Sequence, residues 1–375
     1  MTITELCNEF GIDPIAIKTV EKGVRNNSSL IMDKDQKRYI LQEINHNVFK
    51  DVAGVMENIV AVTNHIRKKT IQNGGDIERC TLSLKTTKNN QYYTSFNDAN
   101  NNPHFFRIYD FIENASTYDE ADESLLFEAG VGFGKFQKDL ADFPAETLKE
   151  SIKDFHNTQS RFENFNALIK KMELEKRYSE LNEAYNEIQY AKAFGIKYAN
   201  AIMQPLKEGT IPTRVVHNDT KLNNVMLDDN THKAVCAIDL DTIMPGSMLF
   251  DYGDAIRYCS NTGAEDDINL KNVSMNFNKF KAFTKGYLSQ TADSITPQEL
   301  DLLPISPIVI AYELGLRFLT DYLDGNKYFK CDSSRPQHNL ERTRAQFTLM
   351  QDMINKLPDM TSYINDCYME FHQQK

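Results

Sequence analysis

The most informative stretch of this chain is His217-Asn218-Asp219-Thr220-Lys221-Leu222-Asn223-Asn224, followed by Ile238-Asp239-Leu240-Asp241. The first stretch has the spacing H-x-D-x-K-x-x-N, and Asp239 comes twenty residues after Asp219. The two stretches supply a carboxylate that can accept a proton, and an amide oxygen and a second carboxylate that can bind metal ions. These are the groups that phosphoryl transfer from a nucleotide requires.

Each of the functional side chains in these two stretches has an expected role. Asp219 is the predicted catalytic base, because a carboxylate must orient the attacking hydroxyl group and take its proton. Asn224 and Asp239 are predicted Mg²⁺ ligands, and Asp241 is expected either to bind the metal ion as well or to support its ligands from behind. Lys221 is expected to meet the transferred phosphoryl group, and His217 to hold the loop by hydrogen bonds. The alternative is that these residues only cap turns, as Asp and Asn often do.

The residues around this pair predict a small sheet among helices. Three short apolar runs, at residues 215–216, 224–227 and 234–240, are typical of strands separated by polar turns. A hairpin from Asn224 to Asp239 would bring both of its ends to one edge of a cleft. We therefore expect the amide and the carboxylate to share an ion.

The segments before and after this region differ in their patterns. Short alternating runs up to about residue 110 predict a mostly β N-terminal lobe, with strands at 29–32, 39–44, 81–84, 92–96 and 105–112 and one helix at 55–69. From about Thr117 onward, helical patterns dominate, with helices expected at 145–170, 176–206, 271–288 and 306–323. A length of 375 residues also favours two lobes, each with its own core.

The nucleotide site is less explicit. Residues 23–29 precede a strand and could cover phosphates with backbone N–H groups, although they lack the G-x-G-x-x-G pattern. Gln42 stands where a kinase strand usually carries a basic residue that holds the α- and β-phosphates. Phe111, Ile112 and Glu113 lie between the two lobes, so their backbone could hydrogen-bond adenine, or they could form a plain linker strand.

Composition limits the partners and the compartment. The formal net charge of −11 provides no general attraction to nucleic acid or to anionic lipid. The six cysteines are scattered without C-x-x-C spacing, which fits a reducing cytoplasm. The N-terminus lacks the pattern of an export signal, and we expect no apolar run to have the length needed to cross a membrane. We expect a cytoplasmic monomer or weak homo-oligomer.

The motifs together resemble those of the aminoglycoside phosphotransferase and choline kinase group. The resemblance implies an α+β, protein-kinase-like two-lobe fold that binds ATP and Mg²⁺. It implies a nucleotide-binding lobe at residues 1–110, a hinge at 111–116 and a catalytic and substrate-binding lobe at 117–375.

Within that group, five segments resemble the N-acetylhexosamine 1-kinases: residues 39–46, 107–114, 217–224, 238–254 and 313–326. This resemblance implies phosphorylation of the anomeric hydroxyl group of N-acetylglucosamine or N-acetylgalactosamine, with Asp219 contacting that group. It also implies that Arg317 and Tyr328 bind the sugar. The residues alone allow a different account, because Glu313, Arg317 and Asp321 have the i, i+4 spacing of a surface ion-pair ladder.

Two alternative functions remain open at this stage. The chain could phosphorylate another small alcohol, such as choline, homoserine or a different sugar. It could also be a non-catalytic relative that binds nucleotide, although the presence of Asp219, Lys221, Asn224 and Asp239 argues against this.

Overall fold

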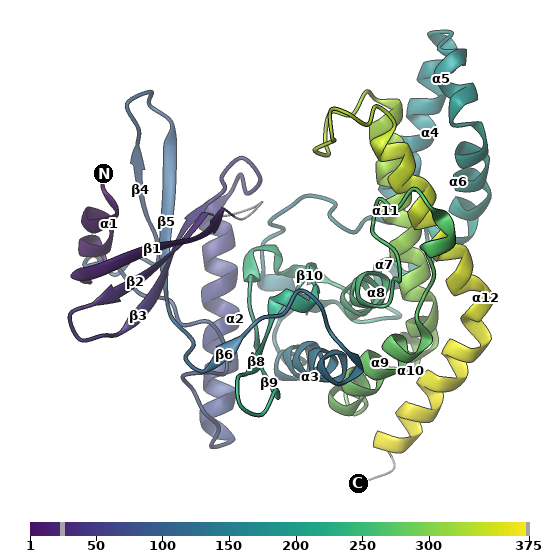
Figure 1. Ribbon diagram of the computed structural model, residues 1–375. Coiled ribbons are helices and arrows are strands. Elements are labelled where there is room, and N and C mark those ends of the chain that lie inside the picture. Colours follow the sequence, from purple (N-terminus) through teal and green to yellow (C-terminus); the bar gives the residue numbers. More distant parts are fainter. Residues whose placement is uncertain (23–26, 373–375) are drawn as a thin grey trace.

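A five-stranded antiparallel sheet forms the smaller part of the molecule, and helices form the larger part (Figure 1). The computed structural model describes residues 1–22 and 27–372. Most of the predicted phosphate-covering loop at 23–29 therefore lies outside the described residues. The arrangement confirms the predicted α+β, two-lobe, protein-kinase-like fold, while the lobe limits at 110 and 116 stay a prediction.

The sheet has the strand order β1-β2-β3-β5-β4. Its elements, with the two helices of this region, are β1 (Pro14–Lys22), β2 (Asn27–Asp33), β3 (Arg38–Ile44), β4 (Thr94–Asn97), β5 (Pro103–Asp110), α1 (Ile3–Glu9) and α2 (Val52–Gln72).

The two faces of this sheet have different surroundings. Ile31, Leu41 and Ile108 pack with residues of α1 in a small core. Side chains alternate along a strand, so the neighbours of Leu41 and Ile108 point to the opposite face. In the register, Gln42 lies opposite Arg107. The second face therefore presents a polar pair between the strands.

The helical region contains most of the remaining chain. Its helices are α3 (Glu123–Asp139), α4 (Thr158–Leu174), α5 (Tyr178–Glu183), α6 (Tyr185–Tyr198), α7 (Met203–Glu208), α8 (Met248–Cys259), α9 (Phe277–Thr291), α10 (Pro297–Leu302), α11 (Ser306–Leu323) and α12 (His338–His372). Between them lie two small sheets, formed by β6 (Ala115–Ser116), β8 (Val225–Asp228) and β9 (Ala234–Ala237), and by β7 (Arg214–Val216) and β10 (Met244–Gly246).

Several predicted boundaries are wrong. Residues 81–84 form no strand, although Leu84 makes one isolated bridge to Tyr109. The helix expected at 145–170 has one 3₁₀ turn, Ala145–Thr147, and then begins at Thr158, because Asp154 adopts a positive φ and the Asn157 side chain caps the helix. The helix expected at 176–206 is divided into α5, α6 and α7. The α-helices and strands that fall outside every predicted range are α1, α3, α8, α10, α12, β1, β6 and β10.

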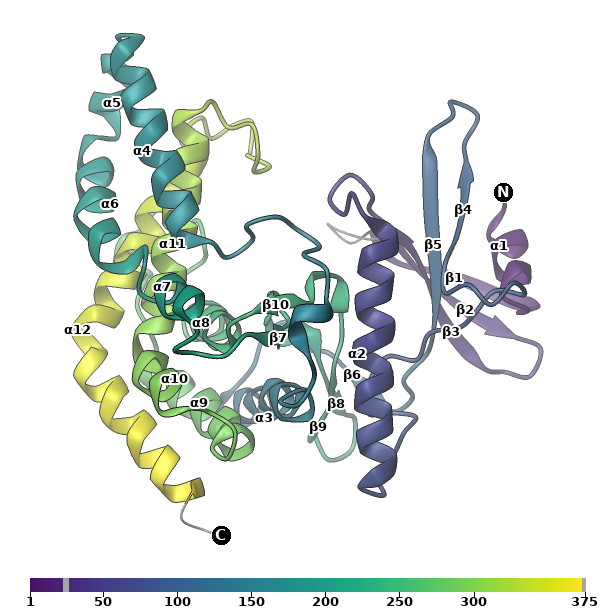
Figure 2. The same cartoon turned by 180° about the vertical axis from the view of Figure 1, so that it is seen from behind.

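Helix α2 lies between the sheet and the helical region in both views (Figures 1 and 2). The buried amide of Asn58 fixes it there. Asn58 Nδ2 donates to the carbonyls of Lys149 and Ile243 at 2.7 and 3.0 Å, and Asn58 Oδ1 accepts from the Lys149 N–H at 2.9 Å. The buried side chains of α2, including Val55 and Ile59, belong to the large core that continues into the helical region.

One stretch, Pro297–Leu323, is long and apolar enough to pass as a membrane span by length and composition. This corrects the expectation that no apolar run has that length. Most of the stretch is buried among other parts of the protein, as is usual for a core helix.

Candidate active site

A cavity of about 830 Å³ lies between the second face of the sheet and the loop after β7. Its lining includes the predicted residues Gln42, Phe111, Ile112, Asp219, Lys221, Asn224 and Asp239. Residues from the N-terminal sheet, from the connection after β5 and from the H-x-D-x-K-x-x-N loop thus meet in one place.

Asp251 holds the loop that carries Asp219. Its carboxylate accepts the backbone N–H groups of His217, at 2.8 and 3.1 Å, and of Asn218, at 2.8 Å. Gln137 Nε2 donates to the same carboxylate at 2.9 Å, and Thr220 Oγ1 donates to the Asp251 backbone carbonyl at 2.7 Å. Burial raises the pKa of Asp251, and nearby His217 together with the backbone N–H groups of His217 and Asn218 opposes that effect. Further along α8, Asp254 and Arg257 pair with each other.

His217 is fully buried and acts on the loop through both ring nitrogens. Its Nε2 lies 2.8 Å from the Ile238 carbonyl, so Nε2 donates and Nδ1 accepts the Asp219 N–H at 3.3 Å. These contacts agree with the expected orienting role of His217. They also tie the loop to the residue before Asp239.

Asp219 has a hydrogen-bond donor on each carboxylate oxygen. Asn224 Nδ2 donates to Asp219 Oδ2 at 3.0 Å, and Lys221 Nζ lies 3.2 Å from Asp219 Oδ1. Asp219 itself is nearly buried, whereas Lys221 is partly exposed at the cavity. The arrangement places a proton acceptor and a partly exposed positive charge side by side.

Asn224 and Asp239 lie at adjacent strand ends, as the hairpin prediction required. β8 pairs with β9 through Val225 and Ala237, and the Ile238 N–H donates to the Asn224 carbonyl at 2.9 Å. Because Asn224 Nδ2 contacts Asp219, its Oδ1 is directed elsewhere. Asp239 adopts the left-handed conformation, with φ of 56°, and lines the cavity.

The residues present fit a magnesium ion. Within residues 1–22 and 27–372, no group of three or more His, Cys, Asp and Glu side chains could hold a metal by itself. Mg²⁺ usually takes one or two carboxylates and completes its shell with phosphate oxygens and water. Moreover, the hydroxyl group of Tyr109, which lines the same cavity, is buried and has no hydrogen-bond partner among the described residues.

Asp241 does not line the cavity. Its Oδ1 lies 2.5 Å from Nη1 of Arg107 on β5, and the two side chains are 0% and 1% exposed. Arg107 Nε and Nη2 both donate to Gln42 Oε1, at 3.2 and 2.9 Å. Burial alone would lower the pKa of Arg107, but Asp241 and neighbouring groups raise it above its usual value. Arg107 therefore keeps its charge between Gln42 and Asp241.

The predicted hinge residues divide into two groups. Phe111 and Ile112 line the cavity, and the Phe111 N–H donates to the Arg38 carbonyl at 3.1 Å. In the part of the chain that the structure describes, the N–H groups of Ile112 and Glu113 make no backbone hydrogen bond. The Glu113 side chain does not line the cavity and pairs instead with Arg38.

Arg317 and Tyr328 lie together at a second, smaller cavity of about 230 Å³. Arg161 of α4 lies beside them and borders the same cavity. Burial and the Arg317 charge lower the pKa of Arg161. Arg317 stands over the rings of Tyr328 and Phe329 at 5.9 and 5.4 Å.

The ion-pair ladder that the sequence also allowed on α11 does not form. Glu313 contacts His156 and Thr158 instead, and Asp321 accepts the backbone N–H groups of residues 327–329. Among the described residues, Arg317 makes no ion pair with either carboxylate.

A chain of contacts connects the two cavities. Phe250 stands next to Asp251, which holds the catalytic loop, and stacks on His156 with ring centroids 5.3 Å apart. His156 Nδ1 lies 2.9 Å from Glu313, one helical turn before Arg317. The small cavity is therefore linked to the Asp219 loop through packed side chains.

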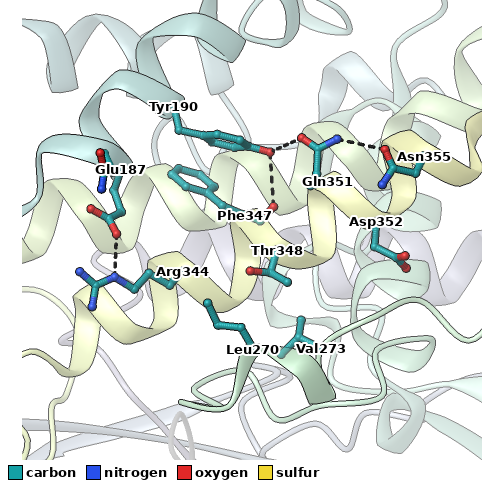
Figure 3. Close-up of a pocket in the computed structure, with 11 residues that line it drawn as sticks. Glu187, Tyr190, Leu270, Val273, Arg344, Phe347, Thr348, Gln351, Asp352 and Asn355 are labelled. Atoms are coloured by element: carbon teal, nitrogen blue, oxygen red, sulfur yellow. Dashed lines mark hydrogen bonds and ion pairs between the residues drawn. The ribbon is translucent and has the colours of Figure 1, made fainter.

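A third cavity, of about 500 Å³, lies between α6 and α12 (Figure 3). Tyr190 and Phe347 form its apolar part, and Arg344 pairs with Glu187 at its edge. It contains none of the residues that the motifs selected.

Sequence reasoning missed Arg107, Tyr109 and Arg161. Arg107 could have been found, because it is the one charged residue between Phe105 and Tyr109 in an apolar strand. Arg161 carries no such signal, since a basic residue near the start of a polar helix is common on protein surfaces.

Comparison with solved structures supports the fold. The chain resembles a microcompartment-associated aminopropanol kinase, with a TM-score of 0.59, 12% identity, and coverage of 95% of this chain and 97% of that one. It resembles the choline kinase of Cryptosporidium parvum Iowa II, with a TM-score of 0.52, 14% identity, and coverage of 94% and 93%. It also resembles amicoumacin kinase hAmiN, whose structure contains AMP-PNP and Ca²⁺, with a TM-score of 0.55, 13% identity, and coverage of 90% and 89%.

A family model decides membership. Residues 16–273, well over half of the chain, match the model for the APH phosphotransferase enzyme family. The matched region includes the H-x-D-x-K-x-x-N loop, the I-D-x-D segment and the sheet that faces them. The chain therefore belongs to the APH phosphotransferase enzyme family.

Proposed function

We propose that this enzyme transfers the γ-phosphoryl group of ATP to the anomeric hydroxyl group of N-acetylglucosamine or N-acetylgalactosamine. The observation that carries the kinase chemistry is the common cavity of Asp219, Asn224 and Asp239. The choice of sugar depends on the resemblance of the motif segments to N-acetylhexosamine 1-kinases. A kinase for another small alcohol is the second candidate, because the family includes such enzymes.

Asp219 is the proposed catalytic base. The anomeric hydroxyl group donates a hydrogen bond to the Asp219 carboxylate, which takes its proton as the oxygen attacks the γ-phosphorus. A bond forms between that oxygen and phosphorus, the bond to the bridging oxygen of ADP breaks, and the products are ADP and the sugar 1-phosphate. Lys221, at 3.2 Å from Asp219, faces the transferred group and compensates its charge.

Asn224 and Asp239 are the proposed Mg²⁺ ligands that face the cavity, and Asp241 supports the site from behind them. When bound, the metal ion neutralises charge on the phosphate oxygens and aligns them for transfer. Phe111 and Ile112 are proposed to receive the adenine through the hinge backbone, while Glu113 contributes only its backbone. Gln42 belongs to the part of the site that holds the α- and β-phosphates.

Arg317 and Tyr328 are proposed to bind the sugar, with Arg161 beside them. A guanidinium group offers several donors to sugar hydroxyl and carbonyl oxygens, and an exposed tyrosine ring can pack on a sugar face. The contacts through His156 and Phe250 support this assignment, because they couple the small cavity to the loop of Asp219. We further propose that the enzyme acts in the cytoplasm as a monomer or weak homo-oligomer on small molecules, without nucleic acid or membrane partners.

The test is an acceptor panel in which ADP release is measured with MgATP. The panel contains both N-acetylhexosamines, choline, ethanolamine, homoserine and glucose. We expect turnover with at least one N-acetylhexosamine, and a product that has lost its reducing end, as measured by ³¹P NMR and a reducing-sugar assay.

The matched control is the 1-O-methyl glycoside of the active N-acetylhexosamine. It keeps every other hydroxyl group and lacks the proposed acceptor, so it should release no ADP. Turnover with the methyl glycoside would show that a different hydroxyl group is phosphorylated. Turnover with choline, ethanolamine or homoserine and none with either N-acetylhexosamine would replace the sugar assignment with the second candidate.

A further inference from the structure

The position on β3 where kinases usually carry a phosphate-binding basic residue is occupied by Gln42. A nucleotide triphosphate brings about four negative charges, so a cavity that already contains Asp219 and Asp239 needs positive charge besides the metal ion. Lys221 lies on the other side of the cavity, next to Asp219. The nucleotide side of the cavity needs a cation of its own.

Arg107 provides a buried positive charge at that place. Arg107 is the cross-strand partner of Gln42, so the two side chains point to the same face of the sheet. Both side chains line the same cavity. Ser28, the partner of Gln42 on β2, completes a polar row across three strands. All three side chains of the row border the cavity.

Hydrogen bonds connect the three side chains of this row and fix their orientations. Gln42 Nε2 donates to Ser28 Oγ at 3.2 Å, which turns Gln42 Oε1 toward Arg107. Arg107 then donates two hydrogen bonds to Gln42 Oε1 and pairs with Asp241. A guanidinium group held on two sides loses little freedom when it meets a further anion.

We propose that Arg107 is the cation that holds the α- and β-phosphates of ATP, supplied from β5 in place of β3. Gln42 and Asp241 are positioning residues for its guanidinium group. This inference depends on the proposed use of ATP and names a residue of that same site. It also gives Asp241 a function that Asp239 does not share, because Asp241 meets the cation and Asp239 faces the cavity.

The test measures the binding of ATP, ADP and adenosine to the full chain by isothermal titration calorimetry, with Mg²⁺ present. Arg107→Gln should weaken ATP and ADP binding by about 10- to 100-fold, the usual range for losing hydrogen bonds to a charged group. Adenosine lacks phosphates, so its affinity should stay unchanged. A residue that only stabilises the fold would not separate ADP from adenosine.

The matched variant exchanges the two cross-strand partners, Gln42→Arg with Arg107→Gln. It returns one arginine and one glutamine to the same pair of positions, so part of the ADP affinity should return relative to Arg107→Gln alone. Arg107→Lys keeps the charge without the planar fork, and should bind ADP with intermediate affinity. If Arg107→Gln does not fold, the ADP and adenosine affinities of the exchange variant and of Arg107→Lys are compared with those of the wild type instead.

Two results would overturn the inference. Equal ADP affinity in the wild type and in Arg107→Gln would remove Arg107 from the nucleotide site, and equal losses for ADP and adenosine would reduce it to a structural residue. A wild-type protein that binds neither ATP nor ADP would reject the proposed function together with the inference. A wild type that binds both nucleotides, with an unaffected variant, would reject the inference alone.

Discussion

Individual side chains have separate roles in holding the loop after β7 and its carboxylate. Asp251 of α8 binds the loop backbone, His217 ties the loop to the Ile238 carbonyl, and Asn224 holds the Asp219 carboxylate. A base held in this way needs no rearrangement when the acceptor binds, which is the condition under which positioning lowers a barrier most.

The replacement of Asp219 by Asn tests this division. The amide keeps the shape of the side chain and cannot accept the proton, so we expect turnover to fall by at least about 100-fold, the usual contribution of a general base. MgATP affinity should change little, because the nucleotide contacts other residues. Steady-state rates and calorimetry on the same preparation measure both. Turnover near the wild-type rate would show that Asp219 is not the base.

The sequence predicted the residues of this loop better than those of the nucleotide lobe, for a physical reason. Asp219, Asn224 and Asp239 stand at fixed spacings because a short hairpin sets the distance between them. Arg107 and Gln42 lie on neighbouring strands that are far apart in the chain. Only the register of β3 against β5 brings these two residues together. Arg317 and Tyr328 were named by resemblance, and the structure places them at one cavity.

At the scale of elements, the strongly amphipathic segments were predicted best. Helix α11 has the predicted limits of 306 and 323, because its apolar residues recur at helical spacing without interruption. Helix α12 was missed although it is the longest one in the described chain, since polar residues dilute its pattern and Pro358 lies inside it. The isolated bridge at Leu84 shows the opposite case, in which an apolar run makes too few pairings to become a strand.

Close packing of α3 against α9 gives a prediction for one element pair. Gly286 of α9 faces the Phe127 carbonyl of α3 so closely that a Cβ atom at Gly286 would collide with it. We expect Gly286→Ala to destabilise the fold by about 1–3 kcal/mol, as overpacking usually does. The midpoint of urea unfolding measures this.

The control is the same substitution at Gly75. There the nearest atom to an added Cβ is the side-chain methyl group of Thr70 at 3.0 Å, which can move aside. Gly75→Ala should change the free energy of unfolding by no more than about 0.5 kcal/mol. Equal effects of the two substitutions would mean that the α3–α9 contact is not tight.

At the scale of the whole molecule, the active site joins parts that fold from distant segments. Arg107 of the sheet meets Asp241 of the helical region, and α2 contributes to the large core of that region. Removing one partner of a buried ion pair typically costs about 3–5 kcal/mol, because it leaves a charge without compensation. The two regions are therefore coupled in stability as well as in chemistry.

Ligand-dependent thermal unfolding tests the whole assembly. A ligand that binds only the folded state, at a free concentration of about 100 times its dissociation constant, stabilises the folded state by about 2.7 kcal/mol. We expect ADP with Mg²⁺ to raise the melting temperature, and a chelator to remove most of that rise. Asp239→Asn should lose the Mg²⁺-dependent part and retain the remainder. An identical rise with and without the chelator would contradict the proposed metal ligands.

The amide of Asn58 has a consequence for control of the enzyme. In protein kinases, activity is often set by displacement of the helix that follows the third strand of the sheet. Here the corresponding helix is fastened to the Lys149 backbone and to the Ile243 carbonyl by three hydrogen bonds from one buried side chain. An on/off switch built on movement of α2 would therefore have to break all three hydrogen bonds at once.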